Sequence, residues 1–178
     1  MSRFKKVSEE VFVAQDSLVQ VDRAQLDVLK TQAALSPRHR ARLCAHQDAQ
    51  DRLHEMLIVL TRQVYIRPHK HINKTESFHV IEGSALVLFF DDAGAITEVI
   101  SLGDAASGRP FYFRNDDSRY HTQLITSDFL VFHEITNGPF NRADTLFAPW
   151  SPDETETAAV RAFVEKLKRD AAQLREAR

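Results

Sequence analysis

The stretch Arg67–Gly83, "RPHKHINKTESFHVIEG", holds three of the chain's eight histidines. His69 and His71 are two residues apart, so both side chains lie on the same face if this segment is extended. Glu76 follows five residues after His71, and Gly83 comes seven residues later, where a tight turn is expected. Three metal-binding side chains from one local segment predict half of a coordination sphere, which a residue from a distant strand must complete.

We expect His121, in "RYHTQLI", to be this fourth ligand, because it lies among strand-forming residues. His79 is excluded by strand alternation, since it comes three residues after Glu76 and points to the opposite face. Three neutral imidazoles and one carboxylate suit a divalent first-row metal, and Fe, Mn, Ni, Co and Zn all remain open. An octahedral ion with four protein ligands keeps two positions for water or substrate.

The residues around the histidine motif favour an all-β fold. The runs Ala85–Phe90 and Ile96–Leu102 flank "DDAGA", a turn of the right length and chemistry for a hairpin. Further runs, "PFYFRN", "YHTQLIT" and "DFLVFHEI", are separated by Asp, Asn and Ser. Short strands at this spacing are typical of a sandwich or barrel.

A helix is predicted on each side of the β region. Leu26, Leu29 and Ala33 have helical spacing and are followed by Pro37. After "APWSPDE", where Ser151 or Asp153 is a candidate cap, an apolar stripe at helical spacing is formed by Val160, Phe163, Val164 and Leu167. We therefore divide the chain into a strand-and-helix extension (residues 1–50), a β domain (51–150) and a C-terminal helix (151–178).

Other side chains are candidates for lining the same cavity. Tyr65 and Arg67 share strand alternation with His69, so we expect both to face the interior: Tyr65 as a catalytic group and Arg67 as a bidentate partner for a carboxylate or phosphate. Lys74 lies inside the ligand loop and can attract an anionic ligand. Glu134 is the second catalytic candidate, because a carboxylate beside a metal can serve as acid or base.

The first motif resembles that of the cupin superfamily: His-X-His, a short gap, Glu, six residues and Gly. His69, His71, Glu76 and Gly83 match it in full, although the usual Gly before the first His is replaced by Gln63. The second cupin motif is matched at His121, whereas its Pro and Gly positions are occupied by Asp116 and Ser118. The resemblance implies a single cupin jelly-roll β-barrel with a metal inside.

More narrowly, residues 40–155 resemble the WbuC-family cupin-fold metalloproteins. The similarity rests on "YIRPHKHINKTESFHVIEGSALVLFFDDAGAI", "YHTQLIT", "FHEITNGPF" and "FAPWSPDE". It implies a link, for some members, to the biosynthesis of surface polysaccharides. It brings no defined reaction, so three functions stay open: a metal-dependent isomerase or epimerase acting on a sugar derivative, an iron-dependent dioxygenase, and a non-catalytic sensor of a small-molecule ligand.

The overall composition narrows the choice of partners. The net charge is −2, with 23 basic and 25 acidic residues well mixed along the chain, which argues against nucleic acid and anionic membranes. Cys44, the single cysteine, cannot form a disulfide within the chain. We expect a cytoplasmic protein that forms a homodimer, with "EEVFVAQ" near the N-terminus as the free edge strand for pairing.

Overall fold

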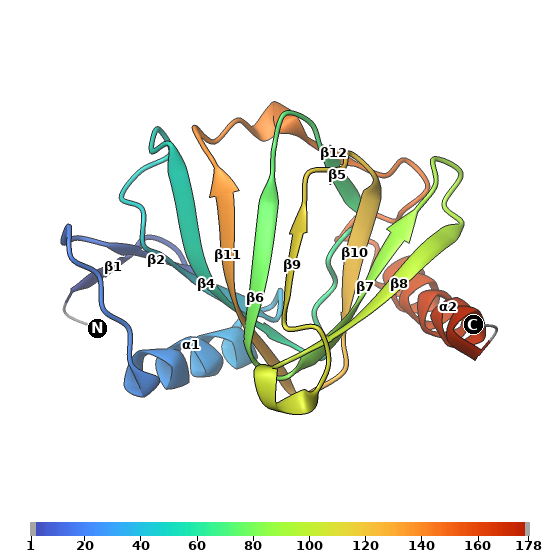
Figure 1. Ribbon diagram of the computed structural model, residues 1–178, viewed down its shortest axis with the longest axis horizontal. Coiled ribbons are helices and arrows are strands. Elements are labelled where there is room, and N and C mark those ends of the chain that lie inside the picture. The colour runs from blue at the N-terminus through green and yellow to red at the C-terminus, as the bar shows by residue number, and fades with distance from the viewer. Residues whose placement is uncertain (1–2, 177–178) are drawn as a thin grey trace.

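The computed structural model describes residues 3–176, which form two packed β-sheets with one helix against the outer face of each (Figure 1). The first sheet has the order β1 (Phe4–Lys6), β2 (Val11–Ala14), β3 (Arg40–Cys44), β4 (Leu53–Thr61), β11 (Phe129–Asn137), β6 (Glu76–Glu82) and β9 (Tyr112–Asn115). The second sheet has the order β12 (Thr145–Phe147), β5 (His69–His71), β10 (Tyr120–Ile125), β7 (Ser84–Phe90) and β8 (Ile96–Gly103). The remaining elements are the helices α1 (Arg23–Leu35) and α2 (Thr157–Glu176) and the short 3-10 helices η1 (Ala105–Ser107) and η2 (Arg142–Asp144). The all-β prediction is confirmed: the two sheets face each other as a β-sandwich, and both predicted helices are present.

The space between the sheets is filled on one side by an apolar core. Alternating residues of facing strands meet there, because every second side chain of a strand points to the same face. The members include Phe78 and Val80 of β6, Val87 and Phe89 of β7, and Phe132 of β11. Phe78 stacks on the ring of Phe132, with ring centroids 5.2 Å apart. Several of the chain's aromatic side chains therefore fill the space between the sheets.

Helix α1 covers the outer face of the seven-stranded sheet. Asp22 caps it, accepting hydrogen bonds from the backbone N–H groups of Ala24 and Gln25, while the Gln25 side chain accepts from the Asp22 N–H. This reciprocal capping box satisfies donors that the first helical turn leaves free. Leu29 and Ala33 are completely buried against β3, β4 and β11, so the predicted apolar stripe is confirmed.

Helix α2 covers the outer face of the five-stranded sheet. Leu167 and Ala171 are buried there against Leu88 and Phe90 of β7. The helix begins at Thr157, later than the predicted caps. Asp153 instead accepts hydrogen bonds from the backbone and hydroxyl of Thr155 and shapes the segment that precedes the helix.

Gly83 carries the chain from one sheet to the other. It separates β6, in the seven-stranded sheet, from β7, in the five-stranded sheet, and has a φ of +88°. A Cβ added at this position would lie 2.1 Å from the carbonyl oxygen of Phe129. The expected turn is therefore present, but it is a corner between sheets rather than a hairpin within one.

The expected edge strand is placed differently. Residues 11–14 form β2, which pairs with β1 on one side and, in parallel, with β3 on the other. Strand β1 lies at the edge instead. The prediction that "EEVFVAQ" supplies a free edge is wrong, because Phe4–Lys6 folds back and covers it. The homodimer and the division of the chain into residues 1–50, 51–150 and 151–178 stay predictions. Strands β1–β3, from residues 1–50, belong to the same sheet as β4, β6, β9 and β11, from residues 51–150.

Replacing Gly83 with Ala is expected to lower the free energy of unfolding by about 3 kcal/mol, because both the backbone strain and the close Phe129 carbonyl oppose a side chain. Gly108 is a matched control: its φ is also positive, at +71°, but a Cβ there would have no neighbour within 4 Å. Gly108→Ala is expected to cost only about 1 kcal/mol. Urea denaturation of both variants measures the difference, and equal losses would contradict the role of the corner.

Candidate metal site

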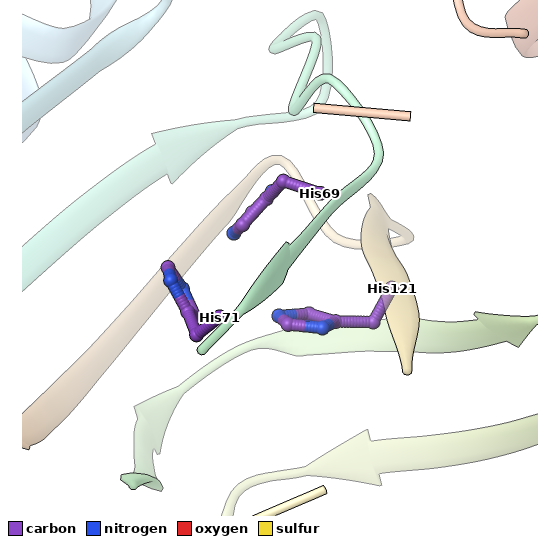
Figure 2. A group of neighbouring side chains, drawn as sticks. All are labelled: His69, His71 and His121. Carbon is purple, nitrogen blue, oxygen red and sulfur yellow. The ribbon is translucent and has the colours of Figure 1, made fainter. Parts of the chain in front are cut away.

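Two short strand pairings bring three histidines together. His69 and His71 lie on β5, and His69 is directly opposite His121 of β10. On the other side of β5, β12 places Thr145 opposite His71 and Phe147 opposite His69. One ligand nitrogen from each of the three imidazoles lies within 4.8 Å of the others (Figure 2). These three side chains are therefore positioned so that they could hold a metal ion.

Glu76 reaches the histidines from the opposite sheet. It is the first residue of β6 and is paired with Thr136 of β11 and Asn115 of β9. Its Oε1 lies 2.9 Å from Nε2 of His121, and its Oε2 lies 3.5 Å from Nε2 of His71. The side chain is buried, with only 3% of the residue exposed. The structure thus brings all four predicted ligands together at a point where the two sheets face each other.

The outer ring nitrogens of the histidines have partners of their own. Nδ1 of His69 lies 2.8 Å from the backbone oxygen of Arg67, and Nδ1 of His121 lies 3.1 Å from that of Arg119. Nδ1 of His71 lies 3.1 Å from the hydroxyl of Thr145. A proton on the Nδ1 atoms that face carbonyls leaves Nε2 free to accept, which is the arrangement found around metal-binding histidines. The donor set therefore fits a divalent cation.

The protonation of the four side chains also fits a cation. Burial lowers the pKa of His69 to about 3 and that of His71 to about 4, so both rings are neutral at pH 7. Burial opposes ionisation of Glu76, but the hydrogen bond from His121 and the neighbouring rings lower its pKa to about 2. Burial likewise opposes a charge on His121, yet the bond to Glu76 raises its pKa. A metal ion binding here would take over the place of the proton that His121 and Glu76 share.

The cluster opens into a cavity of about 1020 Å³. Glu134 of β11 and Phe78 of β6 both line this cavity. The two residues lie directly opposite each other on adjacent strands. Lys74, just before β6, and Arg67, just before β5, line it as well. A cavity of this volume is at the upper end of the range that accommodates small-molecule ligands.

Glu134 has an unusual environment for a carboxylate. Burial, reinforced by the negative charge of Glu76, raises its pKa to about 7, and the positive charges of Lys74 and Arg42 act in the opposite direction. Within residues 3–176 its side chain forms no hydrogen bond or ion pair. Its neighbour His133 points the other way and lies 3.6 Å from Glu55. Glu134 is therefore a carboxyl group able to gain or lose a proton near neutral pH.

Tyr65 lies away from the histidine cluster. Its hydroxyl donates a hydrogen bond to the backbone oxygen of Pro152, and its ring meets that of Phe163 of α2 edge-on. Burial is the main cause that raises its pKa to about 12, so the phenol stays protonated. The expectation that strand alternation continues from His69 back to Tyr65 fails because residues 62–68 form a turn and irregular backbone rather than a strand.

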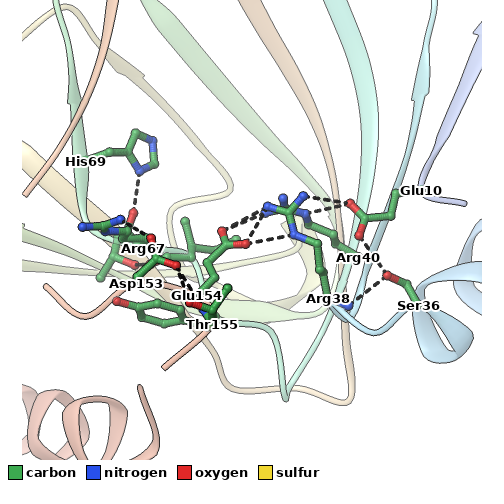
Figure 3. Close-up of polar contacts among 12 residues, drawn as sticks. Glu10, Ser36, Arg38, Arg40, Arg67, His69, Asp153, Glu154 and Thr155 are labelled. Atoms are coloured by element: carbon green, nitrogen blue, oxygen red, sulfur yellow. Dashed lines mark hydrogen bonds and ion pairs between the residues drawn. The ribbon is translucent and has the colours of Figure 1, made fainter. Parts of the chain in front are cut away.

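Arg67 lines the cavity but is engaged with the segment before α2. Its guanidinium lies 2.8 Å from Asp153 and also donates to the hydroxyl and backbone oxygen of Ser151 (Figure 3). Nearby, Arg38 and Arg40 form ion pairs with Glu10 and Glu154. These contacts connect the start of β3 and Glu10, just before β2, to the segment before α2.

Several residues of the site carry no signal in the sequence. Thr145, Asn115 and Arg42 come from segments far from the histidine motif, and only the strand pairing shows that they approach it. Asn115 donates a hydrogen bond of 3.4 Å to Oε1 of Glu76. Two other histidines, His46 and His54, line the far part of the cavity and stack with centroids 4.0 Å apart. His79 is exposed, as strand alternation predicts.

Comparison with known proteins gives one partial family match and several distantly similar solved structures. A family model for a domain of unknown function, DUF6016, matches residues 21–102. No curated protein sequence matches significantly. Among solved structures, protein SO0799 from Shewanella oneidensis is similar over 58% of this chain and 66% of its own, with a TM-score of 0.47 and 16% identity.

Two further solved structures have similar scores. A variant of Bacillus subtilis oxalate decarboxylase OxdC aligns over 55% of this chain and 24% of its own (TM-score 0.44, 18% identity). The capsular polysaccharide assembling protein CapF of Staphylococcus aureus aligns over 60% and 32% (TM-score 0.45, 19% identity). The chain thus spans less than two thirds of the length of these structures, and similarity at this level does not assign an activity. Within residues 3–176, no helix is long and apolar enough to cross a membrane.

Replacing Thr145 with Val removes the partner of His71 Nδ1 and is expected to weaken zinc binding about tenfold, because outer partners orient metal-binding imidazoles. Thr145→Ser keeps the hydroxyl and is the matched control, for which zinc affinity close to that of the unmodified protein is expected. Competition with a chromophoric chelator measures both. Equal affinities in the two variants would contradict an orienting role for this contact.

Replacing Glu134 with Gln is expected to stabilise the metal-free protein at pH 8 but not at pH 4.5. Because the pKa is raised in the folded state, folding favours the protonated carboxyl, and this advantage is lost as the pH rises from the unfolded value toward about 7. The gain at pH 8 is on the order of 3 kcal/mol at most. Denaturation of both proteins at the two pH values tests this, and a pH-independent difference would contradict it.

Proposed function

We propose that this chain is a metal-dependent cupin that acts on a small polar molecule, with His69, His71, Glu76 and His121 as ligands of one divalent transition metal ion. The observation that carries the proposal is the convergence of these four side chains, from three strands in two sheets, at the wall of a large cavity. Within residues 3–176, His69, His71 and His121 are the only group of three or more histidine, cysteine or carboxylate side chains whose ligand atoms all lie within 4.8 Å of one another. Fe, Mn, Ni, Co and Zn remain compatible with the donor set.

A bound ion would act as a Lewis acid toward substrate oxygens or lower the pKa of water. The protein side chains have separate tasks. The backbone oxygens of Arg67 and Arg119 hold two imidazole rings in orientation through their Nδ1 atoms. Ionised Glu76 supplies the negative charge that a divalent ion requires.

Glu134 is proposed as the general acid or base. Without a metal ion, burial and the charge of Glu76 raise its pKa to about 7, and a pKa near neutral pH suits a group that transfers protons. It lies on the same cavity wall as Glu76, two residues along β11 from the residue paired with Glu76. Moving a proton next to a carbonyl, as in isomerisation or epimerisation, suits this pair of carboxylates, of which one stays ionised and the other exchanges protons.

Membership of the WbuC group and a sugar derivative as substrate are parts of the same proposal. They rest on the sequence resemblance over residues 40–155, which implies a link to surface-polysaccharide biosynthesis for some members. A cavity of about 1020 Å³ has room for a monosaccharide.

A ligand-binding or sensor role is the second candidate, and one observation favours it. Tyr65, the other catalytic candidate, is hydrogen-bonded to Pro152 outside the cavity wall, which leaves Glu134 as the proposed proton-transfer group. Under this alternative, Glu134→Gln would leave every measurable turnover intact while ligand binding still depended on the metal.

Protein purified without a chelating tag is expected to contain a near-stoichiometric transition metal, measured by inductively coupled plasma mass spectrometry. His71→Ala is expected to lose it, because His71 supplies one ligand and faces Glu76. His79→Ala is the matched control, since His79 is exposed on the opposite face of β6. Absence of metal from the unmodified protein, even after incubation with zinc, manganese and ferrous iron, would overturn the proposal.

A further inference from the structure

The positively charged residues that line the cavity fall into two groups. Arg38, Arg40 and Arg67 are neutralised by ion pairs with Glu10, Glu154 and Asp153 (Figure 3). Arg42 and Lys74 also line the cavity, but within residues 3–176 neither side chain forms an ion pair or a hydrogen bond. Arg142 of the 3-10 helix η2 also lines the cavity and likewise has none; Arg42 and Arg142 are exposed, whereas Lys74 is half-buried. Three cationic groups in the cavity wall therefore lack a protein counter-charge in contact with them.

The strand register places Arg42 on the wall that contains Glu134. Arg42 of β3 is paired with Ile58 of β4, which is paired with Phe132 of β11, and Glu134 follows two residues later on the same face. Adjacent strands are about 4.8 Å apart, so the Arg42 backbone lies about 10 Å from that of Phe132.

Lys74 approaches Glu134 from the opposite side. It precedes Glu76 by two residues, and β6, which begins at Glu76, is the neighbour of β11 on the side away from β4. The charges of both Lys74 and Arg42 act on Glu134, which agrees with this placement. The two cations therefore lie on either side of Glu134, and the histidine cluster lies close to the Lys74 side.

The negative charges of the inner cavity do not neutralise these cations. Glu76 is engaged by His121 and His71, and within residues 3–176 Glu134 forms no ion pair with Arg42 or Lys74. A divalent metal held by the cluster would make this part of the cavity more positive still. A positively charged, partly enclosed wall concentrates anions and stabilises them more strongly than bulk water allows.

We propose that the molecule accepted by this cavity carries an anionic group, a carboxylate or a phosphate, that is held by Arg42 and Lys74 while its hydroxyl oxygens face the histidine cluster. This inference rests on the proposed function and specifies its substrate class: sugar acids or sugar phosphates rather than neutral sugars. Arg42 binds such a group through two parallel N–H donors, and Lys74 adds a point charge. Arg67, already engaged by Asp153 and Ser151, does not bind the anion.

Three probes with the same sugar ring distinguish a neutral ligand from the two anionic classes. Glucose is neutral, glucuronate carries a carboxylate and glucose 6-phosphate carries a phosphate. Isothermal titration at one ionic strength, first with metal-free protein and then with zinc-loaded protein, is expected to rank at least one anionic sugar tenfold or more above glucose. Comparing the two anionic probes identifies which group the wall prefers. Each of Arg42→Gln and Lys74→Gln is expected to weaken binding of the preferred anionic sugar about tenfold, because each removes one charge-assisted contact.

Lys5→Gln is the matched control, since Lys5 is an exposed cation of β1 outside the cavity wall. It is expected to leave the affinity unchanged. Anionic sugars that bind no better than glucose, or a loss in Lys5→Gln equal to that in Arg42→Gln, would overturn the anion site. Because the metal-free arm does not need the ion, these outcomes are distinct from a failure to bind metal, which would overturn the proposed function instead.

Discussion

The contact between Glu76 and His121 is the interaction on which the site depends. One residue belongs to each sheet, both are buried, and their side-chain atoms approach to 2.9 Å. A carboxylate is stable at such depth only when a charged or hydrogen-bonding partner compensates for lost hydration. The imidazole supplies that compensation, and the strand pairings of β5, β10 and β12 place His69 and His71 beside it.

The division of space between the sheets follows from the same arrangement. On one side of the space between the sheets, aromatic and branched side chains pack against one another in an apolar core. On the other, polar residues of β3, β6 and β11 face a cavity. Each sheet has a helix packed on its outer face, so the strands bury apolar side chains there even where their inner face is polar. Because this outer packing buries apolar side chains of both sheets, the inner face is able to carry charged side chains.

Local spacing in the sequence was sufficient to predict much of the fold and the cluster. His69, His71, Glu76 and Gly83 are close in sequence, and alternation within strands decides which way they point. Alternation failed for Tyr65, because residues 64–68 belong to no strand and no pairing fixes the direction of their side chains. The covered edge of β2 could not be predicted, because pairing with β1 depends on how a short segment folds back. Arg42 and Thr145 were missed for a related reason: their nearness to the site arises only from long-range register.

Strand β3 contributes a separate kind of information to the cavity. The metal-site candidates lie on β5, β6 and β10, while Arg42 lies on a strand that joins the sheet from residues before the histidine motif. Under the proposed anion site, Lys74 lies within the histidine motif, whereas Arg42 comes from a strand that supplies none of the four candidate metal ligands. Residues of β3 can therefore be exchanged without replacing any of the four candidate metal ligands or the groups that hydrogen-bond to them.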